Sequence, residues 1–168
     1  WTHPFGSGSA VAMTAADQDA ARRRVFASLR AGDLYGADVI EVGYLRRGGV
    51  EADTHLALWD AFSRAGRFLT GNGVNDDHSG HSWAAMLNGF VTGTWAASTS
   101  DVDLAAALAG GRAYIAHCGR WPGGSVDMLV DAVAPMGSVL VSGAGTHTVD
   151  VSVANLPSGS TVELLRGP

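Results

Sequence analysis

The sequence predicts an α/β fold that opens with a parallel sheet and is followed by a smaller β-rich segment. Residues 37–45 form a β-branched run that is apolar on both parities, as expected of a strand covered on both faces. A helical pattern and a short strand at 68–70 follow it, and this alternation predicts parallel pairing. Beyond residue 122 the β-rich runs are separated by Gly, Pro and Ser: 127–133, 137–142, 146–153 and 161–165. We therefore expect one unit over residues 1–121 and a second, sandwich-like unit over residues 122–168.

The first expected helix begins at a capping box. Thr14 and Asp17 have the spacing at which a hydroxyl and a carboxylate each satisfy a free backbone N–H. The helix continues to about Arg30, and Gly32 is placed to end it in the left-handed conformation.

A second helix is expected over residues 53–65. Its apolar positions direct Leu56, Trp59 and Phe62 toward a core, with Leu58 as a further candidate, and Gly66 ends it. A third helix begins where Ser100 and Asp103 repeat the capping pattern, and residues 112–117 then form a short strand.

Composition limits the classes of function. The chain has 168 residues, of which 46% are apolar, so it should be globular but too short for a complete barrel of about 250 residues. Its eleven basic residues are all Arg and its net charge is −5, which argues against a broad nucleic-acid-binding surface. The single cysteine, Cys118, excludes an internal disulfide and a four-cysteine zinc site.

Two further expectations concern the setting of the chain. No run approaches about 18 uninterrupted apolar residues, so we expect no membrane span. The chain opens at Trp1 and stops at Pro168 within a strand-like pattern, so we expect a longer parent protein. A β-rich module in a chain without lysine favours secretion of that parent.

The strongest local pattern is Asp76-x-His78, with His81 three residues further on, directly after the expected strand at 68–70. In parallel sheets, chemistry collects in loops at the carboxyl ends of strands. A carboxylate and an imidazole two residues apart can bind one cation, and this ligand pair suits zinc, manganese or iron. The alternative is a capped turn in which Asn75, Asp76 and Asp77 bond nearby backbone N–H groups.

Other candidates come from isolated residues. His3 precedes a proline, which favours an extended conformation at a strand end. Glu41 lies inside an apolar strand, where a carboxylate needs a partner, so we expect either an arginine such as Arg46 or a role in a site. His55 and His147 are expected on the surface.

The sequence resembles the PHP (polymerase and histidinol phosphatase) family of metal-dependent phosphoesterases over about residues 1–117. Gly73-Val74-Asn75-Asp76-Asp77-His78 is similar to the family's G-x-S-D-x-H motif. The other matching elements follow in the family's order: His3-Pro4, Ile40-Glu41-Val42, the helix at 55–60 and Leu108-Ala109-Gly110-Gly111-Arg112-Ala113-Tyr114.

This resemblance implies the later part of a distorted (βα)7 TIM-like barrel, with two or three divalent metal ions at the carboxyl ends of its strands. His3, Asp76 and His78 match metal-ligand positions, and Asn75 replaces the usual serine. The resemblance gives Asp77 and His81 no assured counterpart. The family's opening His-x-His motif and its mid-barrel ligands are absent from this chain.

The expected function is metal-dependent hydrolysis of a small-molecule phosphate ester by the parent protein. Clustered divalent ions would generate hydroxide from water near neutral pH. Asp77 or His81 would act catalytically, by orienting a ligand or protonating a leaving oxygen, while Glu41 and Asn75 would support ligands or substrate.

Two alternatives stay open. One is a non-phosphate metallohydrolase, and the other is a non-catalytic extracellular binding protein with a degenerate barrel. Half a barrel exposes strand edges, so we expect the rest of the parent or a self-association partner to cover them. We also expect this chain alone to show negligible turnover.

Overall fold

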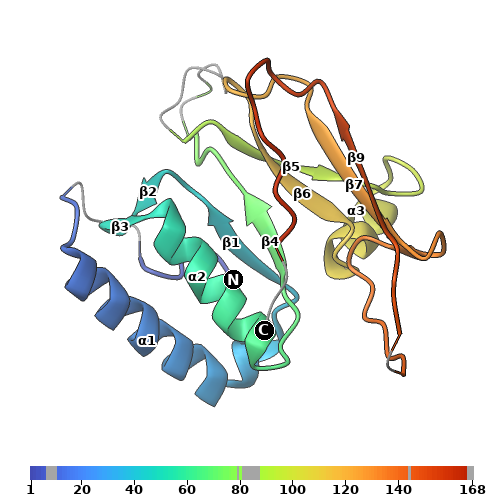
Figure 1. Ribbon diagram of the computed structural model, residues 1–168. Coiled ribbons are helices and arrows are strands. Elements are labelled where there is room, and N and C mark those ends of the chain that lie inside the picture. The colour runs from blue at the N-terminus through green and yellow to red at the C-terminus, as the bar shows by residue number, and fades with distance from the viewer. Residues whose placement is uncertain (7–10, 79, 81–87, 144, 166–168) are drawn as a thin grey trace.

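The computed structural model describes residues 1–6, 11–78, 80, 88–143 and 145–165. In this part of the chain the protein is a mixed α/β structure with three α-helices and several small sheets (Figure 1). The elements in chain order are α1 (Ala15–Ala31), the 3₁₀ helix η1 (Asp33–Gly36), β1 (Val39–Gly43), β2 (Arg46–Arg47), β3 (Val50–Glu51), α2 (Ala52–Arg64), β4 (Thr70–Gly73), β5 (Phe90–Thr94), α3 (Asp101–Ala109), β6 (Ala113–His117), β7 (Ser125–Val130), β8 (Ala134–Pro135) and β9 (Val149–Ala154).

The first sheet confirms the expected parallel pairing. β1 pairs with β4 in parallel, with Val39 opposite Thr70, and α2 lies between them in the sequence. The Trp1 amine donates to the Val39 carbonyl, and the Glu41 amide donates to the Trp1 carbonyl over 3.1 Å. These two bonds have the pattern of a parallel ladder, so the start of the chain lies along the other edge of β1.

The core forms between this sheet and the first two helices. α2 packs on β1, and α1 packs on α2 (Figure 1). Phe62 of α2 is fully buried, with its ring 4.9 Å from that of Phe26 in α1. Burying each large apolar side chain contributes about 1.5 to 3 kcal/mol. The buried members of this cluster are Leu29, Leu34, Ile40, Val42, Leu58, Phe62 and Leu69.

The Thr14 cap of α1 is confirmed, and the Asp17 carboxylate accepts from the Thr14 hydroxyl. The helix ends at Gly32 as predicted, but the left-handed conformation predicted for Gly32 is wrong. The Thr14 hydroxyl accepts from the Asp17 amide over 3.2 Å. Gly32 follows the helix with φ −86°, which is not left-handed. The left-handed residues are instead those of the next turn, including Leu34 at φ 56°. Leu34 is buried in the core, and its packing there accompanies a backbone conformation that a leucine rarely adopts.

The buried face of α2 differs from the expected one. Leu58 and Phe62 are fully buried, whereas Leu56 is 45% exposed. Trp59 is half-buried and its indole N–H donates to the Leu69 carbonyl over 2.7 Å. His55, expected on the surface, is fully buried. Positions 55, 58 and 62 form one stripe at helical spacing, and this stripe faces β1.

Beyond β4 the chain does not continue the parallel pattern. β5 and β6 pair antiparallel, with Thr92 opposite Ile115, and lie against β4. The Thr92 hydroxyl donates to the Gly73 carbonyl over 2.9 Å, which joins the two sheets. α3 begins at the expected cap, where Ser100 accepts from the Asp103 amide over 3.2 Å. No closed barrel is present in the part of the chain that the structure describes.

The C-terminal part forms a three-stranded antiparallel sheet in the order β8-β7-β9. The expected run at 146–153 is shifted to β9, and the runs at 137–142 and 161–165 are not strands. Their apolar side chains are exposed, for example Val141 at 97%, so no partner strand or second layer orders them there. Indole N–H groups of Trp95 and Trp121 donate to the Val126 and Ala154 carbonyls, across the expected boundary near residue 122.

Candidate functional site

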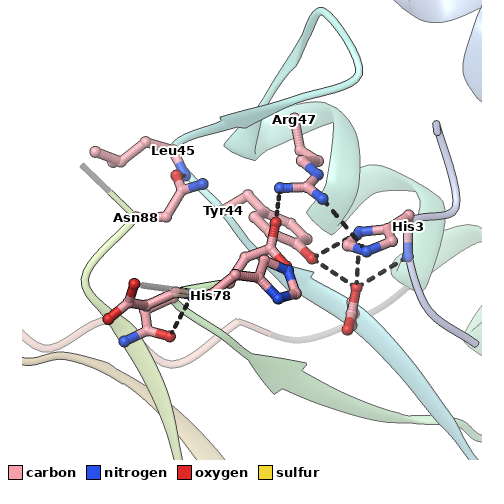
Figure 2. Close-up of polar contacts among 10 residues, drawn as sticks. His3, Tyr44, Leu45, Arg47, His78 and Asn88 are labelled. Atoms are coloured by element: carbon pink, nitrogen blue, oxygen red, sulfur yellow. Dashed lines mark hydrogen bonds and ion pairs between the residues drawn. The ribbon is translucent and has the colours of Figure 1, made fainter. Parts of the chain in front are cut away.

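Several predicted residues lie together at the carboxyl ends of β1 and β4 (Figure 2). His3 follows the segment that pairs with β1, Glu41 lies in β1, and Asp76 and His78 follow β4. Because the strands are parallel, their ends meet at one edge of the sheet. The sequence pattern predicted the functional site at this edge of the sheet.

Glu41 is held by neutral donors. One carboxylate oxygen, Oε2, accepts from the His3 amide at 2.9 Å and from the Tyr44 hydroxyl at 2.6 Å. The side chain is buried, so these bonds offset its desolvation. Of the two alternatives for Glu41, the pairing with Arg46 is wrong, because Arg46 lies 3.8 Å from Glu51 across the β2–β3 hairpin. Glu41 therefore belongs to the same cluster of side chains as His3.

Tyr44 fixes the orientation of the His3 ring. Its hydroxyl lies 3.2 Å from His3 Nδ1 and donates to Glu41, so the oxygen accepts from Nδ1–H. This assignment rests on the partners and leaves a lone pair on His3 Nε2. Burial first, and then the hydrogen bond to Glu41, raise the pKa of Tyr44, which keeps the hydroxyl protonated.

His3 does not have the extended backbone that the following proline predicted. Its φ is 48°, and its carbonyl accepts from the Gly6 amide over 2.8 Å in a turn. Its amide and its ring both contact Glu41. These contacts hold a conformation that costs about 1 kcal/mol or more for a non-glycine residue.

Arg47 joins the two halves of the site. It lies in the β2–β3 hairpin, whose turn needs Gly48 and Gly49 at φ 60° and 81°. Its guanidinium forms an ion pair with Asp76 and lies 3.3 Å from His3 Nε2, which accepts from it. The guanidinium also lies 5.5 Å from the centre of the Tyr44 ring. Figure 2 shows this cation between the residues from the two strand ends.

Both carboxylate oxygens of Asp76 contact other side chains. Oδ2 contacts Arg47, and Oδ1 accepts from His78 Nε2 at 3.1 Å. Burial raises the pKa of Asp76, but the Arg47 hydrogen bond and charge, with His78, outweigh it and hold that pKa below its usual range. The His78 side chain is 87% exposed, so the pair opens to solvent.

The remaining predicted site residues are Asn75, Asp77 and His81. Asn75 Oδ1 accepts from the Asp77 amide over 3.1 Å, which is the turn interaction weighed as the alternative for this loop. The Asp76 side chain does not cap this turn, because its two oxygens contact the side chains of Arg47 and His78. Asp77 lies beside Asn75 in the same loop. His81 lies outside the described residues.

Sequence reasoning missed Tyr44, Arg47 and His55. His55 lies under the site, with its ring 5.3 Å from that of Tyr44 and 4.8 Å from that of Phe5. Burial lowers the pKa of His55 to about 4, against the Arg47 backbone and the Glu41 charge, which raise it. A signal for Arg47 was present, since an Arg-Arg-Gly-Gly turn directly follows the end of an internal strand.

The donor types fit a divalent cation. His3 Nε2, Asp76 and His78 are nitrogen and oxygen donors, and the Arg47 guanidinium already places a positive charge between His3 and Asp76. In their present positions, no three His, Cys, Asp or Glu side chains of the described residues are close enough to hold a metal ion. A cation that used both His3 and Asp76 would therefore displace Arg47.

Comparisons with protein-family models, with curated proteins and with solved structures each found no match for this chain. Among the described residues, no helix has the length and apolar character needed to cross a bilayer.

Proposed function

We propose that this chain supplies part of the site of a metal-dependent hydrolase that cleaves phosphate esters in small molecules. The observation that carries the proposal is the Arg47 cation between His3 and Asp76, at the edge where two parallel strands end. An arrangement of N and O donors around one positive charge is what a divalent cation site needs.

The proposed fold is the later part of a distorted (βα)7 barrel, followed by part of a β-sandwich. The parallel pairing of β1 with β4, and the ladder-like bonds of Trp1 to β1, support the barrel. The antiparallel order β8-β7-β9 supports the sandwich. The rest of a longer parent, or a second copy, would cover the open strand edges.

In this function His3, Asp76 and His78 would hold zinc, manganese or iron. Glu41 and Tyr44 contact the Nδ1 side of His3, which leaves Nε2 as the nitrogen that would bind the cation. A bound divalent ion would neutralise negative charge that develops on the phosphoryl oxygens.

Arg47 then has a second role, toward the substrate. If Asp76 held a metal ion, the Arg47 guanidinium would no longer pair with that carboxylate, and its planar donors would match two phosphoryl oxygens. The Arg47 backbone is anchored in the β2–β3 hairpin, so the side chain stays at the site. Asp77, beside Asn75 in the loop, and His81 orient a ligand or protonate the leaving oxygen.

The first test is metal binding by the purified chain, measured by calorimetry with zinc and with manganese. We expect Asp76→Asn and His78→Ala each to weaken binding at least about tenfold, since removing a ligand costs affinity. Asp60→Asn is the matched control, because Asp60 pairs with Arg64 on the exposed face of α2. Equal affinities for all of these variants would contradict the proposal.

The second test is turnover by the proposed parent protein with p-nitrophenyl phosphate and with bis(p-nitrophenyl) phosphate. Metal-dependent turnover that falls on His78→Ala is expected. Metal binding with turnover of carboxylic esters or amides alone would favour the non-phosphate metallohydrolase. The absence of metal binding, even in Arg47→Met, would favour the binding protein with a degenerate barrel.

A further inference from the structure

We propose that Ser142, His147 and Asp131 form a second site, separate from the first, in which Ser142 is a nucleophile toward activated carboxylic esters. His147 Nδ1 lies 2.6 Å from Asp131 Oδ2, and His147 Nε2 lies 2.9 Å from the Ser142 hydroxyl. A nucleophile, a base and a carboxylate that orients the base are thus joined in series. Such a constellation is recognised by geometry and roles rather than by order in the chain.

The sheet positions two of the three residues. β7 pairs with β9 up to Val130 opposite Val149 (Figure 1). Asp131 follows Val130 and Thr148 precedes Val149, and a backbone hydrogen bond joins these two residues. The Asp131 amide donates to the Thr148 carbonyl over 2.9 Å, and the Thr148 amide donates to Asp131 Oδ1 over 2.8 Å. One carboxylate oxygen is therefore held by backbone, and the other is left for His147.

The carboxylate also sets the tautomer of the imidazole. The hydrogen bond from His147, first, and that from the Thr148 amide hold the pKa of Asp131 below its usual range, so it is ionised near pH 7. An ionised carboxylate only accepts, so Nδ1 carries the proton and Nε2 has a lone pair for the Ser142 hydroxyl. This is the arrangement in which imidazole acts as a general base.

The proposed reaction is acyl transfer from an activated ester. Ser142 Oγ forms a bond to the carbonyl carbon while its proton passes to His147 Nε2, and the bond to the leaving aryloxide breaks. The aryloxide takes that proton. Water then attacks the acyl-serine with the same base, and releases a carboxylic acid and free Ser142. All three side chains are exposed, so charge is stabilised less than in a buried site, and we expect activated esters rather than amides to react.

Labelling of the full chain with a fluorophosphonate tests the proposal. Oγ binds phosphorus, fluoride leaves with the proton, and peptide mapping locates the adduct. We expect Ser142 to react at least about tenfold faster than Ser98, since a positioned base contributes about 100-fold or more in enzymes. Ser98 is the internal control, because its hydroxyl donates to the Asp103 carboxylate and no histidine contact is described for it.

Two comparisons complete the test. His147→Gln should reduce the Ser142 labelling rate to that of Ser98, while circular dichroism stays unchanged. Unfolding the wild type in urea should do the same, and this arm needs no variant. Chelator should have no effect, which separates this site from the proposed metal centre. Labelling of Ser142 no faster than Ser98, or labelling unaffected by both His147→Gln and urea, would overturn the proposal.

Discussion

Arg47 forms an ion pair with Asp76 from a hairpin 29 residues earlier in the chain, and the side chains of both are largely buried. The pair joins the loop after β4 to the β2–β3 hairpin, and through His3 to the start of the chain. It makes the candidate site one connected network, although its members come from three separate segments.

Arg47→Met should lower the free energy of unfolding at pH 7 by about 1.5 to 3 kcal/mol, the range for hydrogen bonds to charged groups. The pKa of Asp76 is lowered in the folded state, so this stabilisation is present above the ordinary pKa of about 3.9 and is lost as pH falls through the lowered value. Urea unfolding at pH 7 and below pH 4 measures both effects. Arg46→Met is the control, since the exposed Arg46–Glu51 pair should contribute under about 1 kcal/mol. Equal losses of unfolding free energy in Arg47→Met and Arg46→Met would show that the Arg47–Asp76 pair stabilises the fold no more than the exposed Arg46–Glu51 pair.

His55→Leu should flatten the pH dependence of stability. The pKa of His55 is about 4 in the fold, and an unfolded histidine titrates near 6.5, so the unfolded chain binds more protons between these values. Wild-type stability therefore rises from pH 4 to pH 6.5, with a His55 contribution of about 3 kcal/mol. Urea unfolding across this range should show a shallower slope for the variant. His117→Gln, at a half-buried ring, is the comparison, and an unchanged slope in His55→Leu would refute the assignment.

Gly43→Ala should destabilise the contact between the first sheet and β6. A Cβ at residue 43 would lie 2.5 Å from the Gly73 Cα and 3.0 Å from Ile115 Cγ2. Backbone cannot yield as a flexible side chain can, so we expect a loss of about 1 to 3 kcal/mol. Gly143→Ala is the control, because nothing lies within 4 Å of its Cβ position. Thermal melts compare the two, and a neutral Gly43→Ala would mean that the strands are not this close.

Removing either helix cap should cost about 1 kcal/mol. Thr14→Ala leaves the Asp17 amide without its partner, and Ser100→Ala does the same at Asp103. Ser28→Ala is the comparison, since Ser28 lies inside α1 and alanine favours helix. Urea unfolding should rank both cap variants below Ser28→Ala, and the reverse order would argue against these caps.

Features that depend on neighbouring residues could be predicted from the amino-acid sequence alone. The caps at Thr14 and Ser100 are local, so the spacing of two side chains was enough to find them. The run around Ile40 predicted a strand buried on both faces, and with the helix that follows it predicted parallel pairing with β4. The strand expected at 68–70 is found as β4 at Thr70–Gly73, so its position is shifted, but the polar loop at residues 75–78 follows it as predicted.

Which distant side chains come into contact depends on the tertiary fold. Arg47 pairs with Asp76, and Tyr44 with Glu41, because the fold brings the hairpin, β1 and the loop after β4 together. His55 is buried because the stripe of α2 that faces β1 includes it, although its residue type suggested the surface. The antiparallel pairing of β5 with β6 is likewise a long-range choice, since local propensity is the same for either strand direction.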